Sequence, residues 1–127
     1  MLISSTVFCQ GIKYEDLEGA KRNAEYLIYQ DHTGSMIRVG DTVEIVRPES
    51  VNNYTAVLYG NNSTGFERVD RIIVNKKVII KKMITHVGAG GDMSIQVRCV
   101  NLSGRRKFAK WVILWDQAIR YGEAKKI

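Results

Sequence analysis

Residues 37–47 read IRVGDTVEIVR, a glycine-aspartate pair followed by an alternating run of apolar and polar side chains. The pair at 40–41 is typical of a tight turn, since glycine adopts backbone angles that other residues avoid. The alternation after the turn places Val43 and Ile45 on one side of a strand and Glu44 on the other. This pattern predicts a half-buried strand of the kind that commonly opens a small β-barrel.

The chain has 127 residues, of which 45% are hydrophobic, so it is long enough to bury a core of its own. No run of glycine, serine or proline separates two halves. We therefore expect a single domain over residues 1–127. Its parts are an N-terminal strand or helix arm (1–36), a β-barrel (37–115), and a short helix with a tail (116–127).

The two cysteines, Cys9 and Cys99, are far apart and have no metal-binding spacing. The first residues lack a basic region followed by an unbroken apolar run, which a secretory signal would show. No stretch is apolar over the roughly 18 residues that a membrane helix needs. These features predict a cytoplasmic protein with reduced thiols, although the two cysteines could pair in a secreted protein.

Residues 14–29 carry apolar side chains at helical spacing. Acidic residues gather near the start of this segment, where a helix dipole favours negative charge. We expect an N-terminal α-helix that packs as a cap on the open end or edge of a sheet; a partner-binding helix is the alternative. Its apolar face would consist of Leu17, Ala20, Ala24, Leu27 and Ile28.

Short strands joined by local turns are expected over most of the remaining chain. The segment 77–87 breaks the alternation, and a β-bulge near Lys81 and Lys82 would restore it. Asp116 is suited to cap a short helix at 117–121 that Gly122 ends. The tail at 123–127 is expected to be frayed. The other expected strands are 54–59, 66–74, 93–99 and 105–115, with turns at 60–65, 75–76, 88–92 and 103–104.

The stretch from Gly40 to Val46 resembles the first strand of SH3-like barrels, and in particular the KOW motif of ribosomal proteins and transcription elongation factors. In that family a Gly-Asp pair precedes a Val-x-Val strand, a glycine turn and a second strand. Here residues 47–50 replace the glycine turn, and the Lys-Gly and Gly-x-Val elements that should follow are absent. The resemblance implies contact with RNA, the ribosome or RNA polymerase.

A helix followed by five strands is also similar to Sm-like barrels, but no Sm motif is present. From the pattern and the resemblance together, we expect a mainly β fold with an N-terminal α-helix (α+β). The strands would form a small antiparallel SH3-like barrel or half-open barrel.

Positive charge is concentrated late in the chain. Residues 1–36 carry three basic and five acidic side chains, and the remainder carries sixteen basic and eight acidic ones, for a net charge of +6. Two spans without a carboxylate, 71–82 and 98–110, stand out, and such clusters attract phosphates. The candidate nucleic-acid-binding residues are Arg71, Lys76, Lys77, Lys81, Lys82, Arg98, Arg105, Arg106, Lys107, Phe108 and Lys110.

Arg106, Phe108 and Lys110 would share one face of a strand, where the aromatic ring could stack on an unpaired base. The same clusters could equally form a solvated strand face on which lysines discourage edge pairing. Both interpretations remain open at this point.

No catalytic or metal-binding pattern is visible. The glycine run at 88–91 lacks the Gly-Lys-Ser/Thr ending of a phosphate loop and precedes a strand, so a hairpin turn is expected. His32 and His86 are the only histidines, and three or four convergent zinc ligands are not evident. Trp111 and Trp115 are expected in the core. We therefore expect no enzyme, no cofactor and no bound metal.

These observations favour a non-enzymatic nucleic-acid-binding module that acts near transcription or translation and binds RNA or DNA. The alternative is a small protein-binding factor, of the kind that phages encode, which modulates or inhibits a host machine through an acidic protein surface. Neither hypothesis involves a membrane.

Overall fold

The computed structural model describes residues 11–46, 54, 56–61, 65–68, 76–88, 90–101 and 110–127. The first part of the chain forms β1 (Gly11–Lys13), the 3-10 helix η2 (Tyr14–Gly19), β2 (Glu25–Tyr26), β3 (Ile28–Gln30), β4 (Met36–Arg38) and β5 (Thr42–Ile45). It continues with β6 (Val57–Asn61), β7 (Gly65–Arg68), β8 (Lys76–Val87), β9 (Met93–Asn101), β10 (Lys110–Leu114), α1 (Trp115–Arg120) and β11 (Ala124–Lys126).

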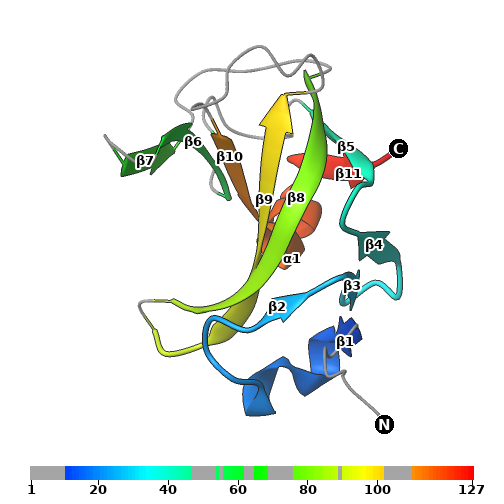
Figure 1. Ribbon diagram of the computed structural model, residues 1–127, viewed down its shortest axis with the longest axis vertical. Coiled ribbons are helices and arrows are strands. Elements are labelled where there is room, and N and C mark those ends of the chain that lie inside the picture. The colour runs from blue at the N-terminus through cyan, green and yellow to red at the C-terminus, as the bar shows by residue number, and fades with distance from the viewer. Residues whose placement is uncertain are drawn as a thin grey trace, which may run out of the picture.

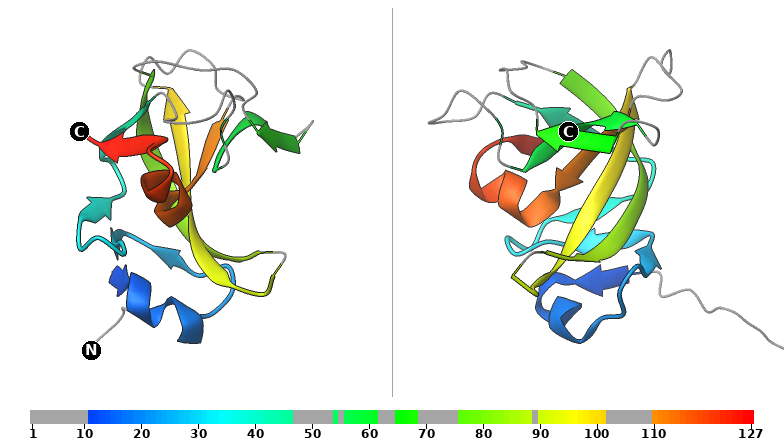
Figure 2. Two further views of the ribbon diagram at one scale, coloured as in Figure 1. Left: turned by 180° about the vertical axis from the view of Figure 1, so that it is seen from behind. Right: turned by 90° about the vertical axis from the view of Figure 1, so that its left-hand side faces the viewer.

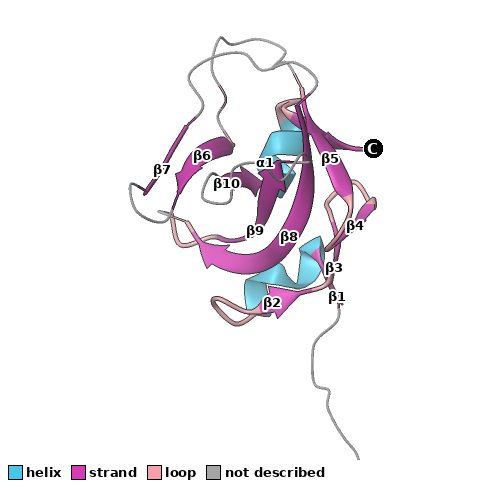
Figure 3. Ribbon diagram, turned by 45° about the horizontal axis from the view of Figure 1, so that its top comes forward, coloured by secondary structure: helices cyan, strands magenta, loops and turns pink. Residues whose placement is uncertain are grey.

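The larger of two sheets has eight strands in the order β11-β5-β8-β9-β10-β6-β7, with β2 paired to the side of β8. Long, antiparallel β8 and β9 form its centre (Figure 1). The strands curl round α1 into a half-barrel (Figure 3). A smaller sheet, in the order β1-β3-β4, lies beside them. This mostly β half-barrel is compatible with an SH3-like barrel.

The hydrophobic core lies between the concave side of the sheet and α1. Figure 2 (left) shows the molecule from behind, with α1 in front of the strands. Trp115 and Ala118 of α1 pack in one cluster with Ile80 of β8 and Val97 of β9. Trp111 of β10 joins the same cluster, so both tryptophans are core residues as expected. The short helix thus closes the open side of a sheet that does not complete a barrel.

The opening stretch forms the predicted turn and strand. Gly40 has a φ of 99°, which only glycine adopts readily. Its N–H donates to the Ile80 carbonyl at 2.8 Å, and the Ile80 N–H donates to the Asp41 carbonyl at 2.9 Å. Val43 and Ile45 are fully buried. The turn therefore docks β5 directly onto the middle of β8.

The expected N-terminal α-helix at 14–29 is wrong. Only η2 is helical there, and the chain then forms the short strands β2 and β3. Asn23 has a positive φ of 56°, which ends any helix, while Tyr26 pairs with Met83 of β8. Helical spacing was misleading because Leu27 is exposed, whereas Tyr26 and Tyr29 supply the buried contacts. The α-helix of the described chain is α1, near the C-terminus.

Three expectations for the central strands are confirmed. The 93–99 strand is part of β9, with Ile95, Val97 and Cys99 buried. The pairing of β8 with β9 shifts register between Ile80 and Lys82, which is the predicted bulge. The glycine run is a hairpin turn that the Gly88 N–H closes by donating to the Asp92 carbonyl at 2.9 Å.

The expected hairpin of 66–74 with 77–87 differs from the observed pairing. Strand β7 pairs with β6 at the far edge of the sheet, while β8 pairs with β9, β5 and β2. Residues 69–75, with the predicted Asn75 turn, lie outside the described residues, as do 102–109 with the turn at 103–104. Within the segment expected as the 105–115 strand, β10 covers 110–114.

The C-terminal end is more ordered than the sequence indicates. Helix α1 begins at Trp115, and Asp116 lies inside it and does not cap it. The tail is not frayed, because β11 pairs with β5 and the preceding Glu123 is fully buried. The Glu123 carboxylate accepts a hydrogen bond from the Ala56 N–H at 2.8 Å. The pairing of β11 with β5 places Lys125 opposite Glu44, whose side chain is largely buried.

Cys99 is a free, buried thiol, and burial raises its pKa above the ordinary range for cysteine. Cys9 lies outside the described residues. Among the helices of the described chain, none has the length and apolar character that crossing a bilayer requires.

Candidate nucleic-acid interface

Several of the predicted cations gather on the convex side of the central strands, which faces the viewer in Figure 1. Side chains alternate between the two faces of a strand, so the buried residues identify the inner face. In β8 these are Val78 and Ile80, in β9 Val97 and Cys99, and in β10 Trp111 and Ile113. The residues between them point outward. We call the outward cations Lys77, Lys81, Lys82, Arg98 and Lys110 the basic face.

The β-bulge determines which lysines belong to this face. Ile80 is opposite Cys99 and Lys82 is opposite Arg98, so Lys81 is the extra residue. A bulge places two residues of one strand against one residue of its partner. Lys81 is exposed and Lys82 half-buried, while Ile80 and Met83 on either side are fully buried. Both lysines therefore lie on the convex side, which regular alternation would not allow.

The cations differ in how far they are neutralised. Lys82 Nζ lies 3.7 Å from Glu25 Oε2, and both side chains are substantially exposed. Lys77 is exposed on β8, opposite Glu44 of β5, whose carboxylate instead lies 3.5 Å from Lys125 Nζ. Arg98 donates from Nη2 to Gln96 Oε1 at 3.4 Å. The positive charge of the face therefore exceeds the negative charge of the two carboxylates beside it.

Apolar side chains lie between these cations. Leu58, Val112, Arg98 and Lys82 occupy consecutive positions of one row across β6, β10, β9 and β8. A neighbouring pair on the same face joins Ile79 to Val100, and both are only partly buried. Val112 is buried, whereas Leu58, Ile79 and Val100 are partly exposed, so the face combines charge with some apolar surface that can contact both phosphates and bases.

The other predicted nucleic-acid-binding residues are not found on the basic face among the residues that the structure describes. Lys76 has the strand parity of Val78 and Ile80, so it points toward the inner side at the end of β8. Arg71, Arg105, Arg106, Lys107 and Phe108 lie outside the described residues. The proposed alternation of Phe108 with cations is therefore still a prediction.

A buried polar cluster joins the loop after β3 to α1, and the sequence does not indicate it. Asp116 is 7% exposed and accepts hydrogen bonds from the Tyr29 hydroxyl and from the His32 N–H, the latter at 2.9 Å. Its Oδ1 also lies 2.6 Å from His32 Nδ1, within hydrogen-bonding distance. Burial and this carboxylate raise the pKa of Tyr29 above its ordinary range.

Asp31 forms the second half of this cluster. It accepts hydrogen bonds from Trp115 Nε1 at 2.9 Å and from the Thr33 N–H at 2.9 Å. Burial alone would raise the pKa of Asp31, but the hydrogen bonds from Thr33, Trp115 and Ser35 outweigh it and lower the pKa. The aspartates thus tie the 31–35 turn to the helix, which is a structural role. His86, by contrast, is exposed near the end of β8.

Grouped His, Cys, Asp and Glu side chains that could hold a metal ion are absent from the described part of the chain. Comparison with known proteins finds no matching family model, no matching curated protein and no matching solved structure. The inference of function therefore depends on the geometry and charge of this chain alone.

Proposed function

We propose that the protein is a non-enzymatic nucleic-acid-binding module whose basic face contacts the phosphate backbone of RNA or DNA. The observation that carries the proposal is the bulge, which turns Lys81 and Lys82 outward beside Arg98. The KOW-like opening strand supports the same assignment, since that family implies work near transcription or translation. Lys77 and Lys110 extend the face to either side of this centre.

Binding of this kind is driven by release of counterions from the phosphates. Lys82 is partly neutralised by Glu25, so we expect about three or four effective phosphate contacts from the five cations of the face. The logarithm of affinity should then fall with the logarithm of salt concentration with a slope of about −2 to −3 for a single strand and about −3 to −4 for duplex DNA.

The test is a charge reversal at two exposed positions, Lys77→Glu together with Lys81→Glu. Both side chains are exposed, so the fold should be retained, which circular dichroism checks. Affinity for a labelled single strand and for a duplex should fall by roughly tenfold or more, with a shallower salt slope. Lys13→Glu together with Lys21→Glu makes the same change in net charge at two exposed positions outside the basic face and is the control. Equal affinity of the double variant and the parent would refute the proposal.

The alternative function is a factor that binds an acidic protein surface. The apolar residues Ile79 and Val100 at the centre of the basic face favour it, because such residues also suit a protein interface. Affinity purification with and without nuclease treatment separates the two functions. A partner protein that remains bound after nuclease treatment, together with no measurable affinity for bare RNA or DNA, would favour the alternative.

A further inference from the structure

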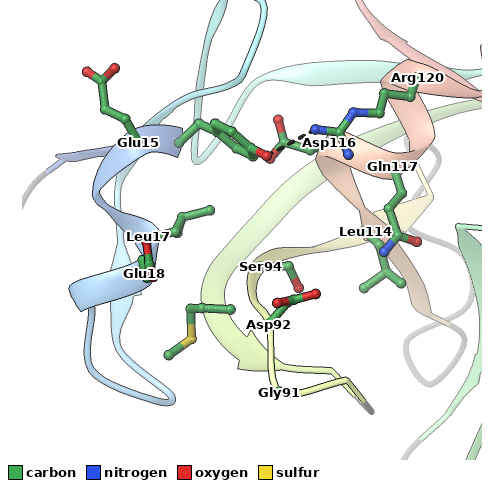
Figure 4. Close-up of a pocket in the computed structure, with 12 residues that line it drawn as sticks. Glu15, Leu17, Glu18, Gly91, Asp92, Ser94, Leu114, Asp116, Gln117 and Arg120 are labelled. Atoms are coloured by element: carbon green, nitrogen blue, oxygen red, sulfur yellow. Dashed lines mark hydrogen bonds between the residues drawn. The ribbon is translucent and has the colours of Figure 1, made fainter.

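A groove of about 700 Å³ lies beside α1, at the turn between β8 and β9, and it is lined by none of the residues of the basic face. Three separate segments form its walls: η2, the turn between β8 and β9, and the junction of β10 with α1. In Figure 4, Asp92 and Ser94 of the β8–β9 hairpin lie between η2 on one side and α1 on the other. The groove therefore depends on the tertiary fold and is not a property of one loop.

Three apolar side chains form part of the lining of the groove. Leu17 of η2 is only 4% exposed, and Met93 and Leu114 are partly buried beside the core. Ser94 and Gln117 add hydroxyl and amide groups that can hydrogen-bond to a peptide backbone. Such a lining can accept aliphatic side chains or the methylene stem of a lysine or arginine.

Two of the charged side chains around the groove, Arg120 and Asp116, already contact other side chains of the protein. Arg120 is engaged with Tyr14, donating from Nη2 to the hydroxyl at 3.0 Å, with its guanidinium 5.8 Å from the ring centre. Asp116 is occupied by Tyr29 and His32. The ion pairs found among the described residues involve neither Glu18 nor Asp92, and both of these carboxylates line the groove on exposed residues.

We propose that this groove is a docking site for a basic, extended segment of a partner protein. Aliphatic parts of the segment would lie on Leu17, Met93 and Leu114, and an arginine or lysine would reach Glu18 and Asp92. The protein as a whole carries +6, so its long-range field repels such a segment. Screening limits that field to about 8 Å at physiological ionic strength, so the local carboxylates decide the affinity in the groove.

The walls are held in place before any partner arrives. Tyr14 is fixed by Arg120 on one side and lies edge-on to His32, with ring centres 5.7 Å apart. On the opposite wall, Gly91 has a φ of 86° within the hydrogen-bonded turn that presents Asp92. A preformed site loses less conformational entropy on binding than a mobile one.

This inference does not depend on nucleic-acid binding, since the two surfaces use different residues. If both hold, the protein is an adaptor that connects a polyanion on its convex face to a basic protein segment in the groove. Binding of a peptide should then be unaffected when nucleic acid occupies the basic face.

The experiment measures fluorescence anisotropy of a labelled peptide that alternates arginine with leucine, and of the same peptide with citrulline in place of arginine. We expect the arginine peptide to bind at least tenfold more tightly than the citrulline peptide. The double variant Glu18→Lys and Asp92→Lys should lose at least tenfold in affinity for the arginine peptide. Asp16→Lys is the matched control for the single variant Glu18→Lys, since Asp16 is exposed on η2 but does not line the groove.

Two results would overturn the proposal. One is equal affinity for the arginine and citrulline peptides, because the carboxylates would then contribute nothing. The other is an equal loss in Asp16→Lys and in the single variant Glu18→Lys, because both make the same change in net charge and the effect would then follow net charge and not the groove. Circular dichroism of each variant shows whether its fold is intact, and Glu18→Gln with Asp92→Asn provides a milder pair that keeps the shape of both side chains.

Discussion

The hydrogen bond between Tyr29 and Asp116 provides a quantitative test of the buried cluster. Tyr29 is fully buried, so its hydroxyl has no access to water if the carboxylate is removed. Tyr29→Phe removes one hydrogen bond to a charged group and should lower the free energy of unfolding by about 1.5–3 kcal/mol. Asp116→Ala removes the acceptor of three contacts and strands the hydroxyl, so we expect a loss of about 3–5 kcal/mol.

The free energy of unfolding of the double variant, Tyr29→Phe with Asp116→Ala, shows whether the two side chains share one buried hydrogen bond. Once the ring has lost its hydroxyl, removing the carboxylate no longer strands a buried donor. The double variant should therefore be more stable, by about 1–3 kcal/mol, than the sum of the two single losses implies. Urea denaturation followed by tryptophan fluorescence measures each value, and Trp115 next to the cluster serves as the probe.

Controls keep this prediction open to refutation. Tyr121→Phe changes a tyrosine that is 51% exposed and should alter stability by no more than about 0.5 kcal/mol. If Asp116→Ala does not fold, Asp116→Asn retains one acceptor oxygen and replaces it in the cycle. Additivity of the two single changes within about 0.5 kcal/mol would contradict a shared buried hydrogen bond.

Further predictions concern backbone strain, acid stability and the bulge. Gly40→Ala should destabilise the protein by about 1 kcal/mol or more, since φ is 99° there. At Gly19 an added Cβ meets nothing within 4 Å, so Gly19→Ala should stabilise the protein by up to about 1 kcal/mol. Thermal unfolding of the two variants measures both changes. The pKa of Asp31 is lower in the folded state than its ordinary 3.8, so the unfolded state takes up its proton first. Its contribution to stability is present above about pH 4 and is lost as the pH falls through the folded pKa, and Asp31→Asn should flatten the acid limb of a stability-versus-pH curve. Deletion of Lys81 should leave a cooperatively folding protein, because Ile80 and Lys82 already face consecutive residues of β9, whereas a non-cooperative transition would show that the bulge is required.

The sequence predicts best where one strand carries its own pattern. β9 alternates cleanly because one face packs on the core, and the bulge in β8 follows from a break in parity that only an extra residue can repair. The Gly40 turn is equally readable, since its backbone conformation demands glycine. In these three cases the local conformation follows from the side chains of a few consecutive residues.

Long-range contacts account for the failures. The 14–29 segment has helical spacing, but pairing of Tyr26 with Met83 and packing of Tyr29 under Asp116 outweigh that local preference. The tail becomes a strand because β5 offers it an open edge. Neither β8 nor Asp116 is near the 14–29 segment in sequence, and β5 is far from the tail, so no local pattern could reveal these contacts. The groove was missed for the same reason, since its walls come from three distant segments.

The two proposed surfaces show why net charge is a poor guide to partners in this fold. A value of +6 suggests a uniformly basic protein, yet strand parity and the bulge together bring Lys77, Lys81 and Lys82 of β8 and Arg98 of β9 to the convex side. Carboxylates of η2 and of the β8–β9 turn line the groove beside α1 together with Arg120. The bulge at Lys81 keeps Lys82 facing outward and the buried Met83 facing inward, although regular alternation after Ile80 would give each of them the opposite face. The basic face and the groove use different residues, and screening over about 8 Å lets each act on its own partner.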